Sequence, residues 1–144
     1  MGTSITSANA ILTLSVLPLF PVPQQLQGFA ADDIYDVAAI KSVETVMGVD
    51  GVLSGGFVYV AIMQSITLQA DSASNAIFDT WWTQMQAAQD VYVATAQIVL
   101  PSISTKFNML NGFLTGYKPL ADAKRTLQPR KYEITWNSVG PSPL

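Results

Sequence analysis

Cysteine and histidine are both absent from the 144 residues of the chain. Without cysteine there is no disulfide, no thiolate metal site and no cysteine nucleophile. Without histidine the chain lacks the commonest general base and metal ligand. No lysine accompanies a plausible pair of serines, so a serine hydrolase is not predicted either. We therefore expect no enzyme, no cofactor and no metal ion.

Charge is scarce as well. Charged residues make up 12% of the chain, against about 25% in a typical soluble domain, and hydrophobic residues make up 49%. A soluble monomer of this size would show more charge, so the chain is either a membrane protein or a protein covered by partners. The uncharged residues 51–70 are long enough to cross a bilayer as a helix. Glycine, serine and glutamine interrupt them and their polarity alternates, so the membrane protein is only an alternative and no membrane insertion is expected.

The charges that are present are divided unevenly along the chain, whose net charge is −3. Residues 1–90 contain one basic and eight acidic side chains, whereas residues 91–144 contain six basic and two acidic ones. The halves are either two faces of a monomer or surfaces through which copies meet head to tail. The candidate residues of such a charged interface are Asp32, Asp33, Asp36, Lys124, Arg125, Arg130 and Lys131.

These acidic and basic clusters have weaker interpretations too. Asp32, Asp33 and Asp36 offer oxygen ligands to a hard cation, but the rest of a calcium-binding loop is missing, which favours a solvated acidic turn. The basic pairs at 124–125 and 130–131 suit an acidic interface partner better than nucleic acid. A chain with a net negative charge is unlikely to form the basic groove that binds nucleic acid.

The first third of the chain predicts an arm, one clear strand and an uncertain connection. Residues 1–9 are rich in serine and threonine and are interpreted as a flexible arm. Residues 10–17 alternate as a strand, which Pro18 ends. A proline-containing extended turn follows, residues 24–29 pair back, and residues 31–40 form a short strand or a turn.

The middle of the chain predicts two strands joined by a glycine-rich turn. A strand over 41–47 is followed by a turn at Gly48–Gly51, with Asp-Gly at its centre. Ser54-Gly55-Gly56 is interpreted as a second break, after which residues 57–69 alternate as one long strand. Its apolar face comprises Val58, Val60, Ile62, Ile66 and Leu68, with Gln64 as the polar exception.

A helix is predicted from about residue 74 to residue 90. Serine, asparagine and aspartate side chains over 71–75 are candidate N-caps, because their oxygens accept from the free N–H groups of a first turn. Ile77, Trp81 and Met85 recur at helical spacing and are the candidate core face.

The remaining residues predict three further strands and a mainly β fold. Residues 91–100 form a strand ended by Pro101, and residues 106–117 form a strand that bulges at Asn111-Gly112. After a polar loop, residues 131–139 alternate with Tyr132, Ile134 and Trp136 inward, and residues 140–144 are a tail. The whole of 1–144 is thus predicted to be one domain, an antiparallel sandwich or barrel with one flanking helix.

The order of these elements resembles the tail tube proteins of bacteriophages with contractile tails, and the related inner tube protein of bacterial type VI secretion. The resemblance rests on Gly-x-Asp-Gly at 48–51, on Ser-Ile-Thr-Leu-Gln-Ala-Asp-Ser at 65–72, and on a helix beginning at Ser74-Asn75. It covers roughly two-thirds of the chain, from about Val43 to the C-terminal strand.

The resemblance implies a structural protein of the virion tail, assembled in the host cytoplasm. Six copies would close a ring with a continuous inner β-barrel, and rings would stack head to tail into a conduit for the genome inside a contractile sheath. Implied partners are further copies, the tail sheath protein, baseplate and neck proteins, the tape measure protein and DNA passing non-specifically. The implied inter-ring loop contains Gly48, Asp50, Gly51, Ser54, Gly55 and Gly56. The alternative within this fold is a subunit that initiates or terminates the tube at the baseplate or neck.

Overall fold

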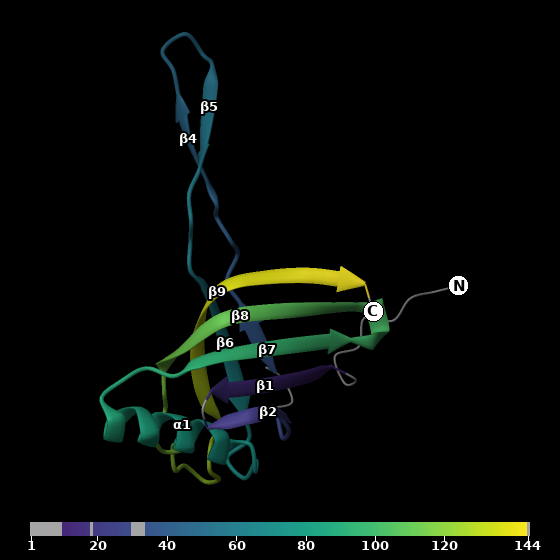
Figure 1. Cartoon of the computed structure of the whole chain (residues 1–144), viewed down its shortest axis with the longest axis vertical. Helices are drawn as coiled ribbons and strands as arrows, with labels where there is room; N and C mark the ends of the chain where they lie inside the picture. The colour runs from purple at the N-terminus through teal and green to yellow at the C-terminus, as the bar shows by residue number, and fades with distance from the viewer. Residues whose placement is uncertain (1–9, 18, 30–33, 144) are drawn as a thin grey trace.

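One curved antiparallel sheet, one helix and one projecting hairpin make up the structure (Figure 1). It is a computed structural model that describes residues 10–17, 19–29 and 34–143. The strands are β1 (Ile11–Leu17), β2 (Phe20–Gln25), β3 (Tyr35–Val37), β4 (Val43–Met47), β5 (Leu53–Phe57), β6 (Ile62–Leu68), β7 (Val93–Leu100), β8 (Thr105–Gly116) and β9 (Arg130–Pro143). The helix α1 spans Asn75–Ala88 and a 3-10 turn spans Pro101–Ile103.

The large sheet has the strand order β2-β1-β7-β8-β9-β6-β3, and every pairing in it is antiparallel. The predicted mainly β fold with one helix is therefore confirmed, but strand pairing leaves the sheet open and does not close it into a barrel. β2 and β3 are its edges. Pro21 and Pro23 lie within β2 rather than in a turn, and an edge strand tolerates them because the missing N–H groups break only its outer ladder.

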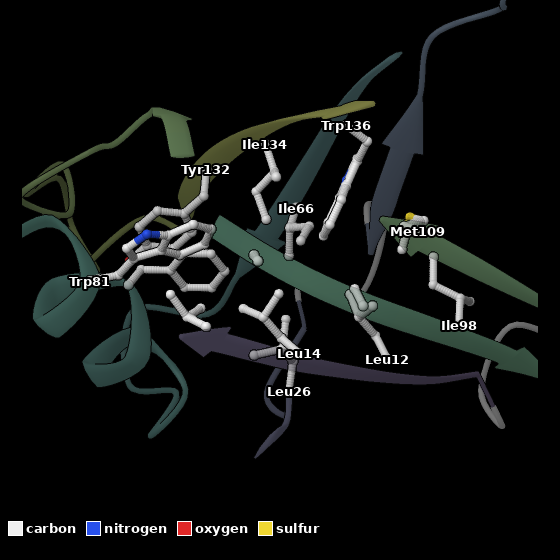
Figure 2. Close-up of a cluster of buried hydrophobic side chains, with 14 of the residues drawn as sticks. Leu12, Leu14, Leu26, Ile66, Trp81, Ile98, Met109, Tyr132, Ile134 and Trp136 are labelled. Carbon is white, nitrogen blue, oxygen red and sulfur yellow. The ribbon is translucent and has the colours of Figure 1, made fainter. Parts of the chain in front are cut away.

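The core lies on the concave side of the curved sheet, where α1 closes one end (Figures 1 and 2). Its buried apolar residues are Leu12, Leu14, Val16, Leu26, Ile62, Ile66, Leu68, Phe78, Trp81, Ala94, Ala96, Ile98, Met109, Tyr132, Ile134 and Trp136. On β1, β6 and β9 they occupy every second position, as period-two burial requires. The prediction that Tyr132, Ile134 and Trp136 face inward is confirmed.

The predicted bulge at Asn111-Gly112 is present and reverses the two faces of β8. Ala96 pairs with Met109 and Ala94 with Gly112, so β8 has one residue more than β7 in this interval. Asn111 takes a positive φ of 53°. Beyond it the inward positions change parity. Phe113, predicted on the same side as Met109, is for this reason exposed on the opposite face.

The predicted long strand over 57–69 is interrupted. β5 already contains Ser54, Gly55 and Gly56, which we predicted as a break, and β6 begins only at Ile62. Residues 58–61 between them are outside any strand, because here the chain leaves the hairpin and enters the sheet. Residues 51–70 are thus β5, a connection and β6, and no helix in the described part of the chain is long and apolar enough to cross a membrane.

Gln64 is the polar exception on the apolar face of β6, and its environment explains it. The side chain is fully buried, and its Oε1 accepts a hydrogen bond of 2.9 Å from the Trp136 indole Nε1. Tryptophan N–H groups in a core need such an acceptor. The glutamine Nε2 has no hydrogen-bond partner among the described residues.

The helix lies within the predicted limits, but its N-terminal serine acts differently from the prediction. Ser74 is the N-cap residue without a side-chain bond to the first turn. Its Oγ instead accepts from the backbone N–H of Gln27 at 2.8 Å. Asn75 donates to the Gln69 carbonyl at 2.9 Å and accepts from the Tyr132 hydroxyl at 2.8 Å. These side chains therefore attach the helix to the sheet.

At the C-terminal end the structure differs from the prediction, and at the N-terminal end the predicted residues are not described. The predicted C-terminal tail is wrong, because β9 continues to Pro143 and pairs there with Thr105 of β8. The predicted N-terminal arm over 1–9 lies outside the described residues, as do Asp32 and Asp33.

Candidate assembly surfaces

The hairpin β4–β5 projects from the body along the longest axis of the molecule (Figure 1). Its strands pair only with each other. A tight turn closes it: Gly48 N–H donates to the Val52 carbonyl at 2.8 Å, and Val52 N–H donates to Asp50 Oδ1 at 3.1 Å. Gly51 has a φ of 83°, which favours glycine. The local sequence thus specifies the turn, whereas an isolated two-stranded hairpin is marginal in water.

Most apolar side chains of the hairpin are exposed. They are Val43, Val46, Met47, Val49, Val52, Leu53 and Phe57, continued at its foot by Tyr59 and Val60. Weighted by their exposed fractions, these side chains present roughly 1,000 Å², given that an aromatic side chain alone contributes about 150–250 Å². A typical monomer shows patches of only about 300–600 Å². The hairpin therefore has the surface of an uncovered interface.

The two faces of the hairpin differ in character. Cross-strand pairs share a face, so Val43 and Phe57 lie with Met47 and Leu53 on one side. Gly55, between these pairs, leaves a gap in that apolar face. The opposite face carries Glu44, Val46, Ser54 and Gly56 and is smaller and more polar.

A cavity of about 270 Å³ lies at the foot of the hairpin, on the side of the sheet away from the core. Its walls are the connection between β5 and β6 and the facing parts of β8 and β9. Tyr59, Val60 and Phe113 give it a partly aromatic lining, and Phe57 meets Tyr59 edge to face at 5.1 Å between ring centroids. The apolar surface of the hairpin thus continues onto the body.

The middle of the sheet surface that faces away from the core carries mainly polar side chains, with the exposed Leu110 and the basic Lys106 beside them on β8. Thr13 and Ser15 of β1 stand opposite Gln97 and Thr95 of β7, and Gln97 stands opposite Asn108 of β8. The Thr13 hydroxyl donates to the Gln97 carbonyl at 3.4 Å.

A half-buried ion pair holds the outer end of the sheet to α1, with Arg130 buried and the Asp79 side chain 44% exposed. Arg130, 8% exposed, donates to Asp79 at 2.7 Å and to the Lys118 carbonyl at 2.9 Å. The Tyr117 hydroxyl also donates to Asp79, and its ring stacks on Trp82 at 4.9 Å. Charge-assisted bonds of this kind are about twice as strong as neutral ones.

The pKa values of Asp79 and of the nearby Tyr132 are shifted from their ordinary values. Burial raises the pKa of Asp79, but hydrogen bonds from Arg130 and Tyr117 and the guanidinium charge outweigh burial, so this pKa lies below its ordinary value. Burial raises the pKa of Tyr132, whose ring lies 5.3 Å beneath the Arg130 guanidinium. The carboxylate is thus charged, and the phenol neutral, near neutral pH.

The loop between β8 and β9 carries the exposed positive charge. Lys118 pairs with Asp122 at 3.1 Å, but Lys124 and Arg125 are exposed and make no ion pair within the described part of the chain. Beside them lies an open cavity of about 530 Å³, lined by Gln69, Ala70, Asp71, Thr126 and Leu127.

The structure separates the predicted charged interface. Asp36 is exposed on β3, Lys131 is exposed on β9, and Lys124 and Arg125 lie in the loop. Arg130 does not belong with them, because its guanidinium is buried against Asp79. Its position directly before an alternating strand gave no signal of this partner, which lies 51 residues earlier. Within the described ranges, no group of three or more side chains is arranged to hold a metal ion.

The predicted core face of α1 is only part of the buried face. Trp81 is fully buried and donates from Nε1 to the Tyr92 carbonyl at 3.3 Å. Ile77 and Met85 are partly buried and pack against the core. The sequence reasoning missed Phe78, which is fully buried and stacks on Tyr132 at 4.1 Å. Its spacing of three from Trp81 was the available signal.

The fold is that of tube and tube-terminator proteins of contractile injection systems. The anti-feeding prophage tube-terminating cap matches with a TM-score of 0.64 and 14% identity, over 100% of this chain and 94% of that one. A sheath/tube terminator of the PVC extracellular contractile injection system matches at 0.65 and 11%, over 99% of each chain. A chain of the PVC sheath-tube complex matches at 0.54 and 12%, over 92% of this chain and 88% of that one. The predicted relation to contractile-tail tube proteins is therefore confirmed at the level of the fold.

The chain belongs to the family described as tail fiber protein gp32, whose model matches residues 3–140. That description names a different part of a tail from the tube that the sequence predicts, while the similar structures belong to tubes and their caps. A search of the curated proteins found no match. The similar solved chains are structural components of injection particles, not enzymes.

Proposed function

We propose that the chain is a ring-forming structural subunit of a contractile tail, in its tube or at the end of the tube. The observation that carries this proposal is the hairpin. Its roughly 1,000 Å² of exposed apolar surface exceeds the ~800 Å² that each partner contributes to a standard stable interface. In the described part of the chain its strands pair only with each other, which supports its being covered by another subunit.

The ring is hexameric, and its sheets form the wall of a central passage. The polar surface around Thr13, Thr95 and Asn108 supports this assignment, because its scarcity of basic side chains, with Lys106 beside it, would let DNA pass without holding its phosphates. Outside the ring lie the sheath and, at the tube ends, baseplate and neck proteins. The genome, preceded by a tape measure protein, uses the passage.

A tube terminator is the second candidate. The specific observation in its favour is that chains from the structures of a tube-terminating cap and a sheath/tube terminator match with TM-scores of 0.64 and 0.65, above the 0.54 of a chain from the sheath-tube complex. A terminator forms one ring and does not polymerise, whereas a tube subunit stacks into filaments.

Assembly of the purified chain tests the proposal. Light scattering after size-exclusion chromatography, with negative-stain images, should show rings, and filaments if the chain is a tube subunit. Val46→Asp places a charge on the hairpin and should reduce assembly. Val22→Asp is the matched control, because Val22 of β2 is 68% exposed and Val46 is 69% exposed. A wild-type chain that stays monomeric at high concentration contradicts the proposal.

A further inference from the structure

The hairpin and the loop between β8 and β9 lie at opposite ends of the molecule. In Figure 1 the hairpin extends from one end of the longest axis, and the loop lies beyond the sheet at the other end, beside α1. The stacking of Tyr117 on Trp82 and the bond from Arg130 to the Lys118 carbonyl hold the start of the loop in that place. The two surfaces therefore cannot meet within one chain, but they meet when copies follow one another along this axis.

The two ends carry opposite charge. Between residues 42 and 60 the only charged side chains are Glu44 and Asp50, both acidic and exposed. The basic loop, defined as residues 118–129, contains three basic side chains and one acidic one. Because Asp122 pairs with Lys118, the charges of Lys124 and Arg125 remain without an ionic partner in the described structure. Copies aligned head to tail thus bring an acidic end to a basic one.

The two ends also fit in shape and polarity. The hairpin tip, defined as residues 48–52, is narrow and presents Val49 and Val52 beside Asp50. The open cavity of about 530 Å³ next to the basic loop is lined by Gln69, Ala70, Asp71, Thr126 and Leu127, so that its apolar wall lies beside one exposed acid, Asp71. Leu127 is 63% exposed, so its apolar surface is available to a partner.

We infer that the basic loop of a second copy receives the hairpin tip, with Asp50 facing Lys124 and Arg125, and Val49 against Leu127. This inference rests on the proposed function and names the partner surface of the same hairpin. Donor and acceptor surfaces differ, so the contact is heterologous and repeats without closing along the stacking axis. In a ring each hairpin then reaches one subunit of the next ring.

Two charge variants test the contact without disturbing the fold. Asp50→Asn removes the tip charge but keeps a side-chain oxygen for the bond from Val52 N–H. Arg125→Glu reverses a charge in the basic loop. Each should raise the protein concentration required for stacking about tenfold, equivalent to about 1.4 kcal/mol. Lys106→Glu is the matched control, since it makes the same charge change at the start of β8.

The absence of cysteine permits a direct second measurement. In a Val49→Cys, Thr126→Cys double variant, which keeps Asp50, Lys124 and Arg125, the introduced thiols are the only ones, and a short bis-maleimide should join copies into a ladder beyond dimers. Each single variant has one thiol per chain and gives dimers at most.

The outcomes separate this inference from the proposed function. Weakened stacking in Arg125→Glu, normal stacking in Lys106→Glu and a covalent ladder support the contact. Normal stacking in Arg125→Glu without a ladder overturns it, while the rings and the proposed function stand. If the wild type forms single rings only, the cross-linking measurement decides between the two outcomes. A ladder then supports the tip-to-loop contact, because the cross-link forms wherever a hairpin tip lies beside a basic loop, even in short assemblies. Monomers without a ladder overturn both.

Discussion

Replacing Gly112 with alanine should destabilise the sheet, because the new β carbon would collide with the Trp136 indole. Ring atoms Cε3 and Cζ3 each lie 2.4 Å from its position. Carbon atoms in a packed core are ordinarily about 3.5–4.0 Å apart. Gly112 is not among the residues with positive φ, so the cost is steric rather than conformational.

The indole has no room to move away from the added carbon. Trp136 is 1% exposed, and its Nε1 is held by Gln64 at 2.9 Å. Relief of the contact needs a shift of about 1 Å in the ring or in β8. Overpacking typically costs ~1–3 kcal/mol, and with two ring atoms in collision we expect about 3 kcal/mol. For a chain of this length that loss lowers Tm by roughly 10 °C.

Urea titration followed by far-UV circular dichroism measures this loss. Gly140→Ala is the control, because a β carbon there meets nothing within 4 Å, and it should stay within about 0.5 kcal/mol of wild type. Trp136→Leu makes space, so adding it to Gly112→Ala should cost about 1–3 kcal/mol less than the two single losses together. Equal stability of the two alanine variants would refute the packing of Trp136 on β8.

Three further predictions concern buried polar groups and the turn. Because the pKa of Asp79 is depressed in the folded state, its stabilising effect is present above the unfolded pKa of about 4 and is lost as pH falls through the folded value. The difference in unfolding free energy between wild type and Asp79→Asn should therefore shrink on acidification, and a pH-independent difference contradicts this. Gln64→Leu and Trp136→Phe each leave the other side chain buried without its hydrogen-bond partner. A double-mutant cycle should therefore give a coupling free energy of about 1–2 kcal/mol, and additive losses of stability contradict the hydrogen bond. Gly51→Ala should destabilise the turn by about 1 kcal/mol, because alanine is strained at the positive φ of this position. Faster amide hydrogen exchange of Val52 should report the loss, and unchanged exchange argues against the turn conformation.

Regular alternation and turn residues allowed most of the elements to be predicted. β1, β7 and the inward residues of β9 follow from period-two patterns that burial on one face imposes. The Asn111 bulge and the Gly48–Gly51 turn follow from residues that adopt positive φ readily. In each case the physical cause acts within a few residues of the pattern.

The incorrect predictions depend on contacts that are distant in sequence. Alternation continued through 57–61 although the chain passes from hairpin to sheet there, since exposed strands and connections can share one pattern. Arg130 was predicted at an interface, but Asp79, 51 residues away, binds it inside the fold. Ser74 was one of the candidate caps of α1. Its Oγ instead accepts a hydrogen bond from the backbone N–H of Gln27.

The low charge content acquires a spatial explanation from the fold. The hairpin exposes apolar side chains that no other described residue covers, and the outward middle of the sheet carries mainly polar side chains. The hairpin carries the exposed acids Glu44 and Asp50, and the basic loop carries Lys124 and Arg125 without an ion pair in the described part of the chain. Composition left open a membrane protein or a protein covered by partners, and the uneven charges left open two faces of a monomer or a head-to-tail contact between copies. The orientation follows from the placement of acids and bases at opposite ends of one long axis, an arrangement that favours head-to-tail contact and opposes head-to-head contact.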